Sequence, residues 1–172
     1  MAYSDLALTH VPATGNVAPA AWGTQIRLNF EFLIDPPVCK VSNSAAQSVA
    51  NNTLAILTAN TETEDNDGMH STVTNTSRLT AQTAGRFLFG TVVEFAANLA
   101  SYNQVDFLKN GATGLPGTRL PPVTTSSHPT ALVLYTLERM SVGDYVETRV
   151  RHTAGSALNV TLVQFNALFL TR

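Results

Sequence analysis

The chain has 172 residues, of which 44% are hydrophobic and only 13% are charged. This length and apolar content are enough for one domain with a substantial core. The net charge is −2 and no basic block is present, which excludes nucleic acid as a partner because nothing would neutralise its phosphates. Much of the polar surface must come from uncharged side chains, among them 23 Thr. Such a weakly charged surface favours a protein that is part of a larger assembly.

Other classes are excluded by single features. Cys39 is the only cysteine, so an intrachain disulfide or a cysteine zinc site is excluded. No apolar run approaches the roughly 18 residues of a membrane span, so we expect no membrane partner. The first residues lack a charged segment followed by an apolar one, so we expect no secretory signal and synthesis in a cytoplasm. We also expect no cofactor.

The first part of the chain differs from the rest. Residues 1–18 are rich in Ala, Pro, Thr and Gly without periodicity, which predicts an extended arm. The next segment predicts a helix over about 20–33, because Pro19 suits its first turn and Asp35-Pro36-Pro37 ends it. Large apolar side chains at helical spacing share one face of this helix: Trp22, Ile26, Phe30 and Leu33. We interpret that face as an attachment surface.

From Val38 onward the patterns favour strands. They are expected at 38–43, 53–58, 71–80, 87–95, 102–109, 131–138, 145–152 and 158–170. Residues 62–68 are expected as a polar loop, and Asn110-Gly111 predicts a hairpin. Short strands with regular turns and no helices between them predict an antiparallel sandwich or jelly roll. The chain therefore divides into an attachment segment, 1–37, and a β domain, 38–172.

The last expected strand, 158–170, alternates in its first half but is apolar on both faces in its second. An antiparallel strand usually keeps one wet face, so a second layer must cover this one. That layer is either a neighbouring subunit or the chain's own loops. If a neighbouring subunit supplies it, the interface residues are Val163, Phe165, Leu168 and Leu170.

Three motifs in order resemble the C1q/TNF-like jelly-roll family. They are Ala84-Gly85-Arg86-Phe87-Leu88-Phe89, Phe107-Leu108-Lys109-Asn110-Gly111 and Val142-Gly143-Asp144-Tyr145-Val146-Glu147. Their order and spacing agree with the family over roughly 38–171. The resemblance implies an all-β antiparallel jelly-roll sandwich, here preceded by an arm and one short helix. It also implies a homotrimer about a threefold axis.

A second, shorter resemblance lies in the N-terminal segment. Residues 20–30, Ala-Ala-Trp-Gly-Thr-Gln-Ile-Arg-Leu-Asn-Phe, are similar to the segment that precedes such domains in structural proteins of tailed bacteriophages. This implies a virion protein made in the cytoplasm of a bacterial host and docked on another virion protein, such as the major capsid or a tail protein. The implied role is capsid decoration or head fibre.

The alternative is a receptor-binding tail or baseplate protein whose loop 112–129 contacts a glycan or protein on the host surface. That loop has no aromatic residue on which a sugar could stack. Tyr102 and Tyr145 could serve instead if they line a seam between subunits.

Little in the sequence supports catalysis or metal binding. His10, His70, His128 and His152 lie in no nucleophile motif, so we expect a protein that is not an enzyme. Asp65 and Asp67 are the only metal candidates, in the run Asp65-Asn66-Asp67-Gly68. A calcium loop of the EF-hand type would place Glu at position 76, which is Thr76. We therefore expect a solvated turn, with a calcium ion shared with other loops as the alternative.

The strand at 145–152 carries Glu147 and Arg149 on one face. They could pair along or across the sheet, on a solvated face, or contact a neighbouring subunit; the scarcity of charge favours the intersubunit contact.

Overall fold

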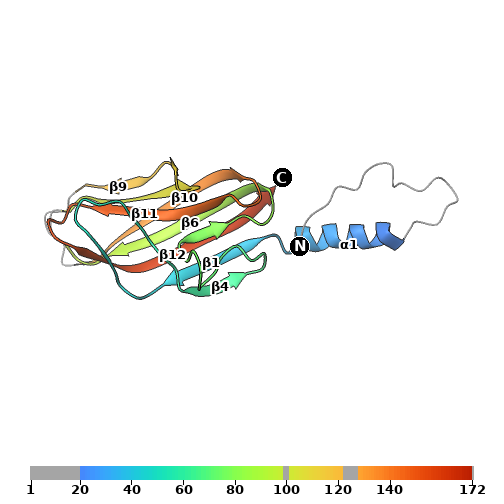
Figure 1. Cartoon of the computed structure of the whole chain (residues 1–172), viewed down its shortest axis with the longest axis horizontal. Coiled ribbons are helices and arrows are strands. Elements are labelled where there is room, and N and C mark those ends of the chain that lie inside the picture. Colours follow the sequence, from blue (N-terminus) through green and yellow to red (C-terminus); the bar gives the residue numbers. More distant parts are fainter. Residues whose placement is uncertain (1–19, 99–100, 122–127, 172) are drawn as a thin grey trace. The chain divides into compact units, whose positions relative to one another are not determined.

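A computed structural model describes residues 20–98, 101–121 and 128–171, so the expected arm lies outside the described residues. The chain divides into two compact units, Met1–Pro37 and Val38–Arg172. Figure 1 shows a helix at Ala20–Ile34, in the described part of the first unit, and strands in the second unit. No helix in the described part is long and apolar enough to span a membrane.

The helix α1 spans Ala20–Ile34, close to the range expected from its apolar spacing. Trp22 and Ile26 are half-buried, whereas Phe30 and Leu33 are exposed. The buried apolar side chain of α1 is Phe32, which the spacing argument omitted. The apolar residues of α1 therefore extend around more of the helix than one face.

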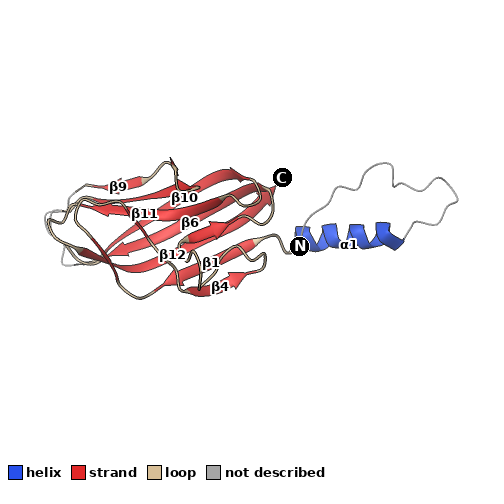
Figure 2. Ribbon diagram, viewed as in Figure 1, coloured by secondary structure: helices blue, strands red, loops and turns tan. Residues whose placement is uncertain are grey.

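The second unit is built from strands that form two stacked antiparallel sheets (Figure 2). Their bounds are β1 Val38–Asn43, β2 Gln47–Val49, β3 Ala55–Ile56, β4 Thr61–Asp65, β5 Arg78–Thr80, β6 Gly85–Phe95, β7 Asn103–Lys109, β8 Thr113–Gly114, β9 Thr118–Leu120, β10 Thr130–Met140, β11 Tyr145–His152 and β12 Leu158–Thr171. The β12 sheet has the order β10-β6-β12-β1-β4, with β2 paired to β12. The β11 sheet has the order β3-β11-β7-β8, with β5 on β11 and β9 on β7. This is a jelly roll, as the sequence predicted.

The core lies between the sheets and is dominated by phenylalanine. Phe89 on β6 and Phe165 on β12 have ring centroids 6.3 Å apart, and Phe165 stacks on Phe107 of β7 at 5.6 Å. Because β7 belongs to the other sheet, Phe165 joins the two layers. The odd-numbered residues Phe87, Phe89, Val93 and Phe95 of β6 share the inward face of the strand and are fully buried.

Strand β12 alternates from Val163 to Leu170, after a break at Thr161 and Leu162 where its register with β6 shifts. This alternation corrects part of the predicted subunit interface. Val163 and Phe165 point into the chain's own core and are buried, so they offer no surface to another subunit. Leu168 and Leu170 point outward and are exposed. The apparent two-faced apolar run therefore has one face in the core and one face open in the single chain.

Two of the sequence motifs meet at one end of the jelly roll. Asn110 and Gly111 both have positive φ, 53° and 67°, as the predicted two-residue hairpin requires. The Asn110 side chain donates to Asp144 Oδ1 at 2.9 Å and accepts from the Tyr145 N–H at 2.8 Å. Hydrogen bonds from the Ser141 N–H and from Asn110 lower the pKa of Asp144. The β7–β8 hairpin and the β10–β11 turn thus stabilise each other.

The core position of Phe165 gives the first testable prediction. Phe165→Ala should lower the free energy of unfolding by about 3–5 kcal/mol, because it leaves a cavity between the two sheets. Val73→Ala, at an exposed loop position, is the matched control and should leave it nearly unchanged. Chemical denaturation at fixed protein concentration measures both, and equal stability of the two variants would contradict the assignment of Phe165 to the core.

Candidate functional site

The outward side of the β12 sheet carries a patch of large apolar side chains, here called the outer apolar face. It is formed by Leu88, Val92, Val133, Tyr135, Leu137, Leu168 and Leu170. Tyr135 is 61% exposed, Leu137 55% and Leu168 37%. These side chains come from β6, β10 and β12, which lie next to one another in the sheet. The sequence indicated only the two leucines of β12.

Strand register aligns this face into cross-strand rows. Leu137 lies opposite Leu88 on β6, which lies opposite Leu168 on β12. One row further along, Tyr135 lies opposite Gly90. A Cβ atom at Gly90 would be 2.5 Å from Tyr135 Cε1, so the glycine lets the tyrosine ring lie against the sheet. On its other side, Gly90 lies opposite Asn166 of β12, so this row ends in a polar side chain.

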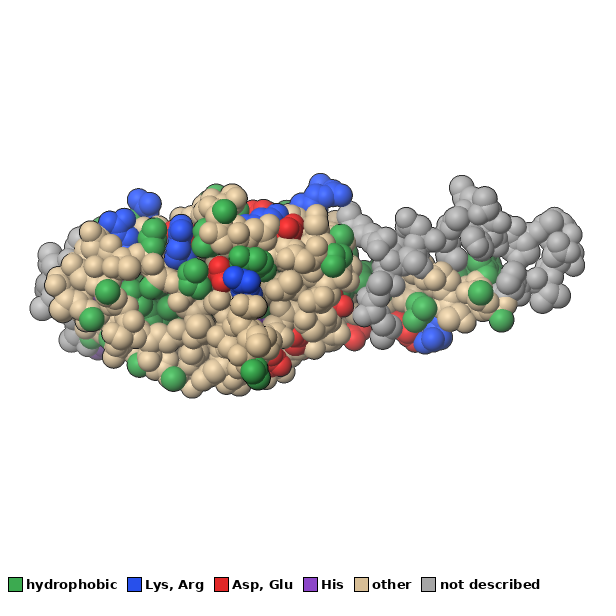
Figure 3. Space-filling view, in the orientation of Figure 1, with side chains coloured by type: hydrophobic (Ala, Val, Ile, Leu, Met, Phe, Trp, Pro, Cys, Tyr) green, Lys and Arg blue, Asp and Glu red, His purple; other side chains and the backbone are tan. Residues whose placement is uncertain are grey.

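The outward side of the β11 sheet is different, because its charges are paired within the chain. Arg149 Nε donates to Asp106 Oδ1 at 2.8 Å, and Arg78 Nε to Glu147 Oε1 at 3.2 Å. Both carboxylates are buried. The expectation of a charge contact between subunits at Glu147 and Arg149 is therefore wrong, since each has its partner on a neighbouring strand of the same chain. Figure 3 shows charged groups in small clusters among uncharged side chains.

The two tyrosines considered for sugar stacking are covered by arginines of their own chain. The guanidinium of Arg78 lies 3.9 Å from the ring centroid of Tyr145, and that of Arg119 lies 5.8 Å from Tyr102. Of the predicted loop 112–129, residues 122–127 lie outside the described residues. The described part includes the short strands β8 and β9, which extend the β11 sheet.

The acidic run around Asp65 is a backbone-capped turn. The Asp65 carboxylate accepts hydrogen bonds from the N–H groups of Met69 at 2.8 Å and His70 at 2.9 Å. Gly68, which directly precedes Met69 in this turn, has a φ of 67°. These two hydrogen bonds give the Asp65 carboxylate a structural role, because they cap the turn that follows β4. The described residues contain no group of three or more His, Cys, Asp or Glu side chains that could hold a metal ion.

The buried histidines of the described part hold backbone segments in place. His152 Nε2 donates to the carbonyl of Val49 at 2.9 Å, while its Nδ1 accepts from the Ala154 N–H at 3.2 Å. The ring of His70 lies between Glu62 and the carbonyl of Thr76, at 2.9 and 3.1 Å. Both rings therefore have full sets of local partners.

Cys39 lies inside the sheet on β1, opposite Asp65 of β4. Burial, together with the nearby carboxylates of Asp65 and Glu62, raises the pKa of its thiol well above the usual range. A thiol held in its neutral form is a poor nucleophile and a poor metal ligand.

Comparison with known proteins identifies the fold. No family model and no curated protein sequence matches the chain. Among solved structures, the globular domain of zebrafish complement 1qA is similar with a TM-score of 0.57 at 14% identity, covering 79% of this chain and 98% of that one. Murine APRIL gives 0.57 at 12% identity, covering 78% and 98%. Eiger TNF from S. frugiperda gives 0.56 at 14% identity, covering 78% and 94%. The second unit therefore has the C1q/TNF-like jelly-roll fold that the motifs indicated.

The cap made by Asp65 gives the second prediction. Asp65→Ala should lower the free energy of unfolding by about 1–3 kcal/mol, because two backbone N–H groups lose their acceptor. The loss should be the same with calcium and with a chelator, and the chelator alone should not shift the melting temperature of the wild type. Thr63→Ala, at an exposed neighbour on β4, is the matched control and should leave the free energy of unfolding nearly unchanged. A large drop in melting temperature on chelation would instead reveal a calcium site.

Proposed function

We propose that this chain is a non-enzymatic structural protein of a tailed-phage virion, a capsid decoration or head-fibre protein that assembles as a homotrimer. The observation that carries the proposal is the outer apolar face, which is open in the single chain. Segment 1–37 attaches the trimer to another virion protein, and the jelly roll of 38–172 forms the exposed body.

The chemistry of the outer apolar face favours a second copy of the chain as its cover. Covering an aliphatic or aromatic side chain of this kind contributes roughly 1.5–3 kcal/mol before ordering costs. A patch of several such side chains on adjacent strands is typical of an association surface. The threefold assembly comes from the C1q/TNF-like resemblance, and the low charge of the chain is in keeping with it.

The attachment role of the N-terminal unit is supported by α1. Phe30, Leu33 and Ile34 are exposed on a helix of 15 residues, a length that is marginal for an isolated helix in water. An apolar groove on a capsid or tail protein would bury them. A trimer presents three such helices, so weak individual contacts would combine into firm attachment. The phage assignment itself is supported by the similarity of residues 20–30 to phage structural proteins.

A non-enzymatic role agrees with the state of the reactive groups. The buried His70 and His152 are engaged by local partners, and the thiol of Cys39 is held neutral. The receptor-binding alternative is less well supported, because Tyr102 and Tyr145 lie beneath arginines.

The assembly is tested with a substitution on the outer apolar face. Leu137→Asp should convert the trimer to folded monomer, because a charge buried in the interface would have no partner. Val73→Asp, at an exposed loop position, is the control and should stay trimeric. Multi-angle light scattering gives the mass, and circular dichroism checks the fold. A wild-type chain that is a stable monomer at micromolar concentration would overturn the proposal.

The division of roles is tested by truncation. A chain of residues 38–172 should keep its β circular-dichroism signal and remain trimeric, yet fail to join particles that lack the native protein. Ile26→Asp in the full chain should have the same effect on joining, with Thr24→Asp as the control. Truncated protein that decorates particles as well as the full chain would show that attachment runs through the jelly roll. Binding to host glycan, with only a few copies per particle, would favour the receptor-binding role.

A further inference from the structure

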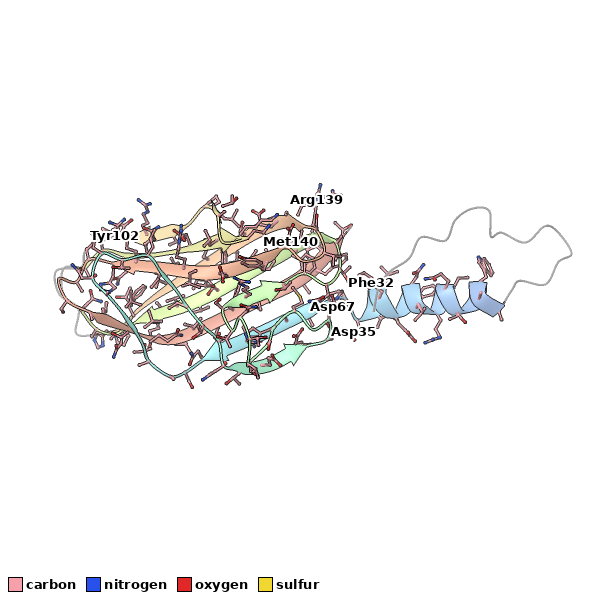
Figure 4. All side chains as sticks on the ribbon, viewed as in Figure 1. Phe32, Asp35, Asp67, Tyr102, Arg139 and Met140 are labelled. Atoms are coloured by element: carbon pink, nitrogen blue, oxygen red, sulfur yellow. The ribbon has the colours of Figure 1, made fainter. Side chains whose placement is uncertain are left out.

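Two arginines lie directly opposite each other at one end of the β12 sheet. Arg86 on β6 and Arg139 on β10 are register partners, and both are exposed on the outward side beside the outer apolar face. Figure 4 places Arg139 at the end of the jelly roll away from Tyr102. Neither guanidinium has a hydrogen bond or ion pair with any described residue. Like charges directly opposite each other destabilise a sheet. The repulsion between these two arginines is therefore uncompensated in the single chain.

The other edge of the same sheet is acidic. Strand β4 carries Glu62, Glu64 and Asp65, and two of these are used within the chain: Glu62 contacts His70, and Asp65 caps the following turn. Glu64 is exposed and makes no hydrogen bond or ion pair with any described residue, although its register partner is Lys40. It is the carboxylate that β4 leaves available to a partner.

The strand order places these two features at opposite edges of one sheet. In the order β10-β6-β12-β1-β4, the arginines lie on the first two strands and Glu64 on the last. In a closed ring, each copy presents one edge to the opposite edge of the next copy. A ring built on the β12 sheet would therefore bring the arginines of one copy toward Glu64 of its neighbour.

The strand register determines how far Arg86 and Glu64 are offset along the strands, and therefore how the sheets must tilt in the trimer. Glu64 is level with Lys40, Asn166 and Gly90, and Arg86 lies four residues further along β6, about 13 Å. From β10 to β4 the sheet is about 19 Å wide. An offset of about 13 Å across a width of about 19 Å is removed when the strands tilt by about 35° to the threefold axis.

We propose that Arg86 and Arg139 of one copy bind the carboxylate of Glu64 of the neighbouring copy in the trimer. This inference rests on the proposed function and adds the contact that fixes the order and register of the copies. Two guanidinium groups side by side match the two oxygens of a carboxylate, which gives direction to the contact. The outer apolar face supplies most of the affinity, while the charges at its rim select the correct pairing.

The test reverses the charge of the side chains at each edge of the sheet separately, and then at both edges together. In the full chain, Glu64→Arg alone and the pair Arg86→Glu with Arg139→Glu should each raise the concentration at which the trimer dissociates by roughly tenfold or more. The chain carrying all three substitutions should recover the wild-type dissociation concentration, because every contact is present with its charges exchanged. The matched control for charge is Arg119→Glu with Arg151→Glu on the β11 sheet, which should leave the trimer unchanged.

A mixing experiment tests the pairing of the two edges directly. When isotopically labelled wild type is unfolded and refolded together with the triply substituted chain, native mass spectrometry should find trimers of each chain alone, because mixed rings place like charges together. Reversals that leave the trimer unchanged, reversals that the triple chain does not rescue, or free mixing with the wild type would each overturn this inference while the trimer stands. A monomeric wild type would overturn both this inference and the proposed function.

Discussion

The contact of Phe165 with Phe89 and Phe107 is the constraint on which the rest of the jelly roll depends. Phe165 sits on the central strand of one sheet and stacks on a ring of the other, so it fixes which face of β12 points inward. Successive side chains of a strand point to opposite faces. Once Phe165 is inside, Leu168 and Leu170 must be outside, however apolar they are. The outer apolar face follows from the core.

Much of the fold could be predicted because its strongest signals are local. The alternation in β6, the Asn110-Gly111 turn and the spacing of apolar residues in α1 each depend on a few neighbouring residues. The strand β4 was missed because its sequence, Thr-Glu-Thr-Glu-Asp, looks like a loop, and only pairing with β1 makes it a strand. Conversely, of residues 53–58 and 71–80 only Ala55–Ile56 and Arg78–Thr80 are strand. Residues 72–77 form bends and a turn, and the residues on either side of β3 are irregular.

The candidate site was harder to predict because its residues are brought together by the pairing of strands that are far apart in the sequence. Nothing local reveals that Leu137, Leu88 and Leu168 form a row, since they lie far apart in the sequence and meet only when β10, β6 and β12 pair. The same reason explains the error at Val163 and Phe165. An apolar run shows that two faces are apolar, but it does not show which face the core takes.

The two sheets differ in how the few charged side chains on their outward sides are partnered. On the β11 sheet, Arg149 and Arg78 neutralise buried carboxylates of their own chain. On the β12 sheet, the apolar side chains lie over β10, β6 and the end of β12. Arg86 and Arg139 near one edge, and Glu64 at the other, have no hydrogen bond or ion pair with any described residue. A face whose apolar side chains lack a cover and whose edges carry opposite charge is complementary to another copy of itself. In the trimer that we propose, association is confined to this side of the jelly roll, and the β11 sheet forms the outer surface.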